Sequence, residues 1–517
     1  MKKITYLLLI LSGLLLASCE DMLTQENPDR MIPENYWRNK ADVERTMASA
    51  YAMLENSVDE WTFAEVRVTV EAFREDLYEL GEDPYNYPNW VELANFSYTN
   101  GNSQFSLYWK YNYIGINRAN QIIHYLSLMD ETKITANDKK ALLAEAKFLR
   151  AYYNFKLLLN WKEIVIRNSY ITNMKDAALL AKDVSPRSEC WNFIIQDFKD
   201  AANDLPPASN QAKGRATQGA AYSYLGFAYL TKASEEKSKA DFKNASDALE
   251  KVTGYSLVPM NKYIGMFDGS NENSSESIFE LQLSLISDNN AFYATALHSF
   301  IAHPSLGGWD EIRPSEKLVN EFKKETIVTP DGDKIYDPRL YSTLFVRNTA
   351  EDNNADILDY FNNGNGNVYN YEFDEWFGDN GRPNFRKFLP KEEWELWENF
   401  TGINIPLMRY SNVLLMLAEA YNEQDLPALA IKKINEVRDR ALLPNMKGSS
   451  KEEIRAQIEH ERIVEFALEN TRWYDLRRWN KIESALQSVG RTDYNKAKNE
   501  FYPIPLIELN SNSGIKR

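Results

Sequence analysis

Residues 141–161 read ALLAEAKFLRAYYNFKLLLNW, and their apolar side chains recur at steps of three and four residues. One stripe consists of Leu142, Ala146, Leu149, Tyr153 and Leu157. This spacing is typical of an amphipathic α-helix, and the further apolar residues on its flanks predict burial on more than one side. The stretch therefore predicts a mainly α fold.

The same helical period recurs on both sides of this stretch. Helices are expected over residues 214–232, 239–252, 405–421, 426–441 and 451–480, the last with a break near Asn470. The segments 224–249 and 417–442 look like diverged tetratricopeptide units, which are helix–turn–helix repeats of about 34 residues. Because such units stack to build one continuous core, the sequence predicts a tetratricopeptide-like scaffold of helical pairs.

Residues 254–404 have a different character. They hold short alternating stretches such as 277–285, the turn dipeptide Asp331-Gly332 and the low-complexity run NNGNGN at 362–367. Loops of this length in a compact protein are usually functional or disordered. We expect a single domain of residues 35–517, with a helical scaffold at about 35–253 and 405–517 and a loop-rich variable insert carrying a few short strands at about 254–404.

Residues 1–18 are expected to be a secretory signal. Lys2 and Lys3 precede the apolar run 7–16, which is too short to span a bilayer core. The sequence Leu16-Ala17-Ser18-Cys19 is similar to the processing box of bacterial lipoproteins, in which the cysteine becomes the lipid-carrying first residue. Residues 19–34 would then be the lipidated cysteine and a flexible tether, with Cys19 as the only membrane attachment. A plain signal peptide with an incidental cysteine is the alternative.

The composition argues against several classes of function. A formal charge of −16 disfavours nucleic acid as a partner, and two cysteines cannot make a disulfide scaffold. Four histidines, with no P-loop, dinucleotide, Gly-x-Ser-x-Gly or His-Glu-x-x-His motif, point to no cofactor, no metal site and no catalytic residue. Carboxylate pairs such as Asp374-Glu375 could serve a glycoside hydrolase, but solvated surface explains them better. Cys190 is expected to be a small buried residue.

Aromatic residues in loop-like contexts are the candidate ligand contacts. They are Tyr85, Tyr87 and Trp90 in the proline-containing segment 81–90, Trp309 after Gly307-Gly308, and Tyr371 and Trp376 in a polar Gly/Asn-rich stretch. The prolines exclude a regular helix over 81–90. Rings on loops suit carbohydrate recognition, because the apolar face of a pyranose stacks on a ring while polar side chains bond its hydroxyls. Local packing of these rings is the alternative interpretation.

Several blocks of sequence resemble one family. They are Cys19-Glu20-Asp21-Met22-Leu23, Tyr36-Trp37 leading into Asp42-Val43-Glu44, residues 113–120, 144–153, 405–420, 461–467 and 472–479, and Tyr502-Pro503-Ile504-Pro505. Together they resemble the SusD-like (RagB/SusD) outer-membrane lipoproteins. Within them, Asp475 lies three residues from both Arg472 and Arg478, which predicts ion pairs along one helix.

The resemblance implies a SusD-like fold and a non-catalytic nutrient-binding lipoprotein on the outer-membrane surface of a Bacteroidetes-type cell. Its partner would be a SusC-like TonB-dependent transporter, to which it delivers a captured oligosaccharide. By approximate location, the resemblance also implies ligand-binding positions at Arg74, Asp76, Tyr85, Tyr87 and Trp90, and a second set at Trp309 and Arg313. Capture of peptides by the same architecture, as in the RagB branch, is the alternative.

Overall fold

A computed structural model of the protein describes residues 36–55, 63–81, 87–172, 180–285, 294–328, 332, 334–346 and 381–516. Helices dominate these residues, and their strands are short and paired two by two. The prediction of a mainly α fold with a few short strands is confirmed.

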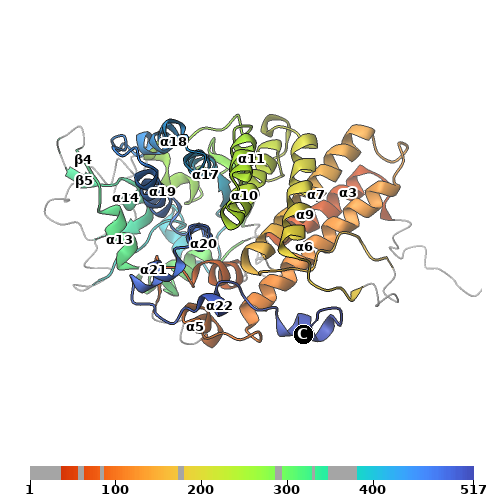
Figure 1. The fold of residues 1–517 in the computed structure, drawn as a ribbon, viewed down its shortest axis with the longest axis horizontal. Helices are drawn as coiled ribbons and strands as arrows, with labels where there is room; N and C mark the ends of the chain where they lie inside the picture. The colour runs from red at the N-terminus through yellow and green to blue at the C-terminus, as the bar shows by residue number, and fades with distance from the viewer. Residues whose placement is uncertain are drawn as a thin grey trace, which may run out of the picture.

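Long helices pack side by side, largely in chain order (Figure 1). They are α3 (Lys40–Tyr51), α6 (Ser103–Leu128), α7 (Ala136–Asn160), α9 (Arg187–Asp204), α10 (Gln218–Glu236) and α11 (Lys239–Leu249). The row continues from α11 directly to α17 (Tyr410–Glu423), which packs against α18 (Pro427–Arg440) and α19 (Lys451–Phe466). The chain between α11 and α17 therefore leaves the helical row and returns to it.

Side-chain caps fix where the scaffold helices begin. Thr135 accepts a hydrogen bond from the Asp138 backbone N–H at the start of α7, and Thr217 caps α10 in the same way. Ser450 and Glu453 form a reciprocal capping box at the start of α19. Each cap satisfies backbone donors that a first helical turn leaves free. The Thr217 cap places the start of α10 at Gln218, four residues after the predicted start.

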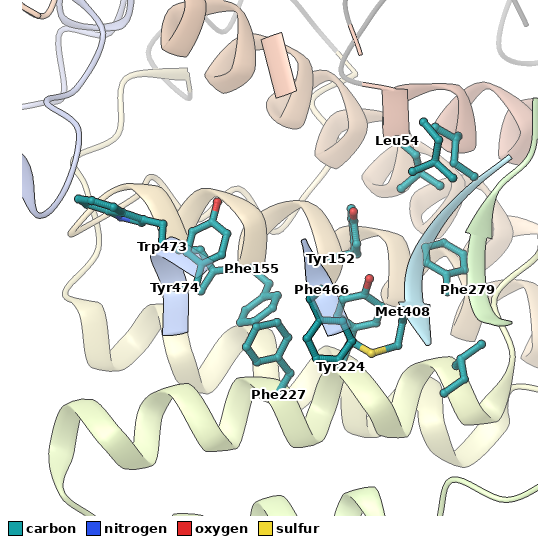
Figure 2. Packing of buried hydrophobic residues seen from close by; sticks show 14 of the residues in the cluster. Leu54, Tyr152, Phe155, Tyr224, Phe227, Phe279, Met408, Phe466, Trp473 and Tyr474 are labelled. Atoms are coloured by element: carbon teal, nitrogen blue, oxygen red, sulfur yellow. The ribbon is translucent and has the colours of Figure 1, made fainter. Parts of the chain in front are cut away.

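The second half of α7 is buried on all sides. Every residue from Phe148 to Asn160 is buried. Figure 2 shows Phe155 of α7 facing Phe227 of α10, and their ring centroids lie 5.1 Å apart. The predicted burial of this helix on more than one side is confirmed, and Cys190 is buried as expected.

β8 (Ile405–Arg409) is a strand where the sequence predicts a helix. It pairs antiparallel with β2 (Ser277–Leu281), and Figure 2 shows Phe279 and Met408 beside these two strands. The apolar spacing of 405–421 looks helical throughout, but the distant partner strand takes the backbone hydrogen bonds of its first five residues. The helix α17 therefore begins only at Tyr410.

The other elements are short. The remaining strand pairs are β1 (Tyr78–Leu80) with β3 (Ile312–Pro314), β4 (Thr326–Val328) with β5 (Lys334–Tyr336), and β6 (Leu344–Phe345) with β7 (Asn384–Phe385). The short α-helices are α4 (Thr69–Ala72), α5 (Pro88–Ala94), α12 (Leu297–Ile301), α13 (Glu316–Phe322), α14 (Arg339–Thr343), α20 (Arg472–Arg478), α21 (Ile482–Gln487), α22 (Lys496–Asn499) and α23 (Leu506–Ser511). Turns of 3₁₀- or π-helix are η2 (Ala52–Glu55), η3 (Phe63–Val68), η5 (Ala208–Asn210), η6 (Met260–Lys262), η7 (Ile264–Met266), η9 (Pro304–Leu306) and η11 (Glu393–Trp397).

The C-terminal helical stretch breaks where the sequence predicts. Asn470 takes a left-handed conformation (φ 56°) between α19 and α20. Asp475 pairs with Arg478 as expected, at 2.9 Å, but its other partner is Arg462 of α19 at 2.7 Å. The prediction of an Arg472–Asp475 pair is wrong, because Arg472 binds a carboxylate from a distant part of the chain.

Candidate functional site

The two segments that the resemblance marks as ligand-binding meet in the structure. β1 and β3 pair antiparallel with Glu79 opposite Arg313, and the Gly81 N–H donates to the Glu311 carbonyl at 3.0 Å. A Cβ at Gly81 would lie 1.4 Å from the Asp310 carbonyl oxygen, so only glycine permits this approach. Segments more than two hundred residues apart in the sequence are thereby brought to one place.

Arg74 and Asp76 lie beneath this junction, with no exposed surface. The Arg74 guanidinium lies over the rings of Trp473 and Tyr502, at 4.4 and 4.0 Å from their centroids. Asp76 accepts two hydrogen bonds from Arg472, at 2.9 and 2.8 Å, and one from Lys317 at 2.5 Å. These contacts attach the segment before β1 to the C-terminal helices. In this structure both side chains hold the segment before β1 in place from the protein interior.

The charge pairs set the ionisation of Asp76. Burial by itself would raise the pKa of this carboxyl. The hydrogen bonds and charge of Arg472, together with Lys317, outweigh burial and lower the pKa of Asp76 to about 2. Asp76 is therefore ionised at neutral pH, and its charge is compensated inside the protein.

Trp90 lies on a helix, which corrects the prediction that proline excludes helix over 81–90. Pro88 occupies the first turn of α5, where a missing N–H costs nothing. Trp90 is 2% exposed and packs against Phe300 with ring centroids 5.4 Å apart. Tyr87 stacks on Trp90 at 4.0 Å and is 45% exposed. Tyr87 is thus the ring of this pair that offers surface to a ligand.

Trp309 and Arg313 are half-buried on the neighbouring segment. The Trp309 backbone N–H donates to the Ser299 carbonyl at 2.7 Å. The Arg313 guanidinium forms an ion pair with the buried Asp310, with Nε 2.9 and 2.7 Å from its two carboxylate oxygens. Since Asp310 already compensates the charge of Arg313, a neutral ligand fits beside it better than an anion.

The structure adds two tryptophans that the sequence interpretation did not select. Trp394 and Trp397 lie on η11 and are 60% and 63% exposed. Gly307, with φ +75°, permits Trp397 and the Leu396 backbone to lie close to the Trp309 segment. A Cβ there would lie 2.8 Å from the Leu396 carbonyl oxygen and 2.9 Å from Cε3 of Trp397. The signal that could have found them is their spacing of three residues in the glutamate-rich segment 391–398.

Three consecutive residues of α12 hold the three aromatic segments. The Phe300 ring packs against Trp90 of α5, and the Ser299 carbonyl accepts from Trp309. The His298 side chain lies with Nε2 2.8 Å from the Glu398 carbonyl oxygen at the end of η11. We call Tyr87, Trp309, Trp394 and Trp397 the α12 site, because each has exposed surface and lies on a segment that α12 holds.

His298 is neutral in this arrangement. Burial lowers the pKa of its imidazole to about 4, although the hydrogen bond with Glu398 opposes this. A carbonyl oxygen can only accept a hydrogen bond, so Nε2 carries the proton and donates. The ring thereby fixes the end of η11.

The remaining predicted positions lie outside the described residues. These are the lipidation position Cys19 and the aromatic residues Tyr85, Tyr371 and Trp376. Among the residues that the structure describes, no group of three or more His, Cys, Asp and Glu side chains could hold a metal ion. Within that part of the chain, no helix has the length and apolar character needed to cross a membrane.

Two family models match the chain. The model described as the SusD family matches residues 275–517. The model described as starch-binding associating with outer membrane matches residues 23–230.

Individual relatives match over nearly the whole length. SusD-like protein P2 of Formosa agariphila is 24% identical, and the alignment covers 99% of this chain and 98% of that protein. A SusD superfamily protein from Bacteroides vulgatus has a TM-score of 0.77 at 25% identity, covering 93% of this chain and 99% of that one. A laminarin-binding SusD-like protein has a TM-score of 0.69 at 22% identity, with coverages of 93% and 99%. With SusD models matching both its N-terminal and C-terminal parts and SusD-like relatives matching it end to end, the chain belongs to the SusD-like (RagB/SusD) family.

Proposed function

We propose that this SusD-like protein is a non-catalytic surface protein that captures a nutrient glycan at the α12 site and delivers it to a SusC-like TonB-dependent transporter. The observation that carries the proposal is the convergence of three ring-bearing segments on His298, Ser299 and Phe300 of α12. Each segment presents at least one aromatic ring with exposed surface.

The chemistry of the α12 site suits a sugar. Aromatic rings offer flat apolar faces on which pyranose rings stack, and nearby carboxylates accept hydrogen bonds from sugar hydroxyls. Glu79 and Arg382, at 3.1 Å, form an exposed pair beside β1 that can exchange its partners for hydroxyls. Asp76 is paired with Arg472 and Lys317, and Asp310 with Arg313, so these charges support the binding segments without demanding a charged ligand.

The relatives support glycan as the ligand class. One solved neighbour is described as a laminarin-binding SusD-like protein, and one family model is described as starch-binding associating with outer membrane. Attachment through a lipid on Cys19 would place the protein on the outer-membrane surface, where a barrel partner could receive its cargo.

The test is calorimetry of the chain from Glu20 onward, purified without lipid, against neutral and acidic glycans. A stacked site of this kind is expected to bind with a Kd of about 1 μM to 1 mM. Tyr87→Ala and Trp309→Ala should each weaken binding severalfold. Leu128→Ala, at a residue 67% exposed on α6, is the matched control and should leave the Kd unchanged.

The outcomes separate the alternatives. Binding of a peptide mixture with no glycan bound would replace glycan by peptide as the cargo. Turnover of a bound glycan, abolished by a single carboxylate substitution, would contradict the non-catalytic assignment.

A further inference from the structure

We propose that Trp394 and Trp397 form a rigid stacking platform, the tryptophan pair, which selects neutral glycan chains and rejects acidic ones. This inference rests on the proposed function and adds the class of glycan to it. Two independent features carry it, namely the geometry of η11 and the charge around the pair.

The two rings leave the same side of η11. Residues three apart in a 3₁₀-helix eclipse one another, and Trp394 and Trp397 have this spacing. Leu396 between them is 1% exposed and anchors the opposite side of the turn in the core. At a rise of about 2 Å per residue, the two positions lie about 6 Å apart along the axis, close to the length of one sugar unit. The spacing fits two consecutive units of a chain better than one monosaccharide.

Backbone contacts on both sides hold η11 in place. Before it, the Lys391 N–H donates to the Asp268 carbonyl at 3.1 Å. After it, Thr401 and Thr295 exchange two backbone hydrogen bonds of 2.9 Å, in addition to the His298 bond to Glu398. A platform fixed in advance loses little conformational entropy when a ligand binds, so exposed rings can contribute to affinity.

Four carboxylates surround the tryptophan pair. Glu392, Glu393, Glu395 and Glu398 lie within seven residues. Among the described residues, none of the four forms an ion pair, and Lys391 is the adjacent cation. Partial burial and the charge of Glu392 raise the pKa of Glu395, as expected where carboxylates crowd together. The electrostatic potential at the tryptophan pair is therefore negative.

This charge selects the ligand by its hydrogen-bonding groups. An ionised carboxylate only accepts hydrogen bonds, and a sugar hydroxyl can donate one. A uronate or sulfate group on a glycan cannot donate and carries the same sign of charge as the glutamates. At separations of about 8 Å in water, four like charges weaken binding roughly three- to tenfold, and salt screens the effect.

The experiment compares a neutral glycan with its carboxymethylated form. Laminarin, starch, a galactomannan and a galactan, each beside its carboxymethylated derivative, are titrated into the chain from Glu20 onward at 20 mM and 500 mM NaCl. We expect at least one neutral glycan to bind, with its carboxymethylated form at least about threefold weaker at low salt and the difference reduced at high salt. Equal or tighter binding of the acidic form would overturn the inference while leaving glycan capture intact.

Two sets of variants locate the effect. Replacing all four glutamates by glutamine (E392Q/E393Q/E395Q/E398Q) should bring the affinities for the neutral glycan and its carboxymethylated form together, because glutamine keeps an oxygen that accepts from hydroxyls but carries no charge. Retained discrimination would overturn the role of these carboxylates.

Loss of affinity for a purified transporter, but not for glycan, on Trp394→Ala/Trp397→Ala would make the pair a protein-docking surface and overturn the inference. If neither form of any glycan binds, the proposed function itself fails.

Discussion

Asp76 and Arg472 form a two-point salt bridge across 396 residues of sequence, with oxygen–nitrogen distances of 2.9 and 2.8 Å. Both side chains are buried, and Lys317 binds the same carboxylate. The bridge ties the segment before β1 to the start of α20, so the binding loop rests on the C-terminal scaffold.

Asp76→Asn should destabilise the protein without abolishing ligand binding. Removing one partner of a buried pair costs about 3–5 kcal/mol, because it leaves uncompensated charge in the interior. Urea unfolding measures the loss, and calorimetry at low temperature measures the Kd. Asp425→Asn is the control, because Asp425 is exposed and pairs with Lys239 and Lys451, so this substitution should cost far less stability than Asp76→Asn. Full stability with lost glycan binding would instead make Asp76 a ligand contact.

Glu465→Gln should be among the most destabilising single substitutions. Burial opposes ionisation of Glu465, but the charges of Arg440, Arg409 and Arg339 lower its pKa well below the ordinary value. Glutamine would leave these arginines short of a counter-charge, at a cost of about 3–5 kcal/mol. The matched control is Glu423→Gln, which removes the partly exposed pair with Arg455 and should cost less than about 1 kcal/mol. Equal destabilisation in the two variants would contradict this account.

Acid should lower the stability of the folded protein, in part through the titration of His298. The pKa of His298 is about 4 in the folded protein, and an unfolded histidine titrates near 6.5. Below pH 6.5 the unfolded chain binds a proton that the folded chain excludes, so this stability is lost as the pH falls from 6.5 to 4. The loss approaches about 3 kcal/mol. His298→Gln keeps a donor but does not titrate, so its urea-unfolding free energy should fall less over this range. Parallel losses in the two proteins would assign acid sensitivity to other groups.

Gly307→Ala should weaken glycan binding more than it weakens the fold. A side chain at φ +75° is strained, and its Cβ would push against Trp397. Gly332→Ala is a close control, because Gly332 also has positive φ but no atom within 4 Å of the added Cβ. Both variants carry the strain of positive φ, so any extra stability that Gly307→Ala loses in thermal unfolding reports its clash with η11, and only Gly307→Ala should raise the Kd severalfold. An unchanged Kd would exclude the packing of Trp397 on residue 307 from the binding mechanism.

Local patterns in the sequence predict the helices well. The apolar period of 141–161 corresponds to α7, and the break near Asn470 lies between α19 and α20. Local patterns do not identify β8, because its extended conformation depends on pairing with β2, more than a hundred residues earlier. They also do not identify the helix at Trp90. Proline ends a helix at most positions but is tolerated in the first turn, where Pro88 lies.

The site is harder to predict, because it depends on what tertiary packing covers. Aromatic character alone favours burial, which holds for Trp90, yet Trp394 and Trp397 are left exposed. The charges of Arg74 and Asp76 suggest a surface position, but aromatic rings cover Arg74 and the Arg472 guanidinium pairs with Asp76 in the interior. The convergence on α12 joins Trp90, Trp309 and η11, which follow one another at separations of 219 and 84 residues, and no local pattern reports that contact.

The most direct test of glycan capture at the α12 site is the affinity of the double variant Trp394→Ala/Trp397→Ala for whichever glycan the wild-type chain binds. Each stacked ring contributes about 0.5–1.5 kcal/mol, so the Kd should rise at least about fivefold while thermal unfolding stays within a few degrees of wild type. A Kd within twofold of wild type and of the Leu128→Ala control would contradict the account.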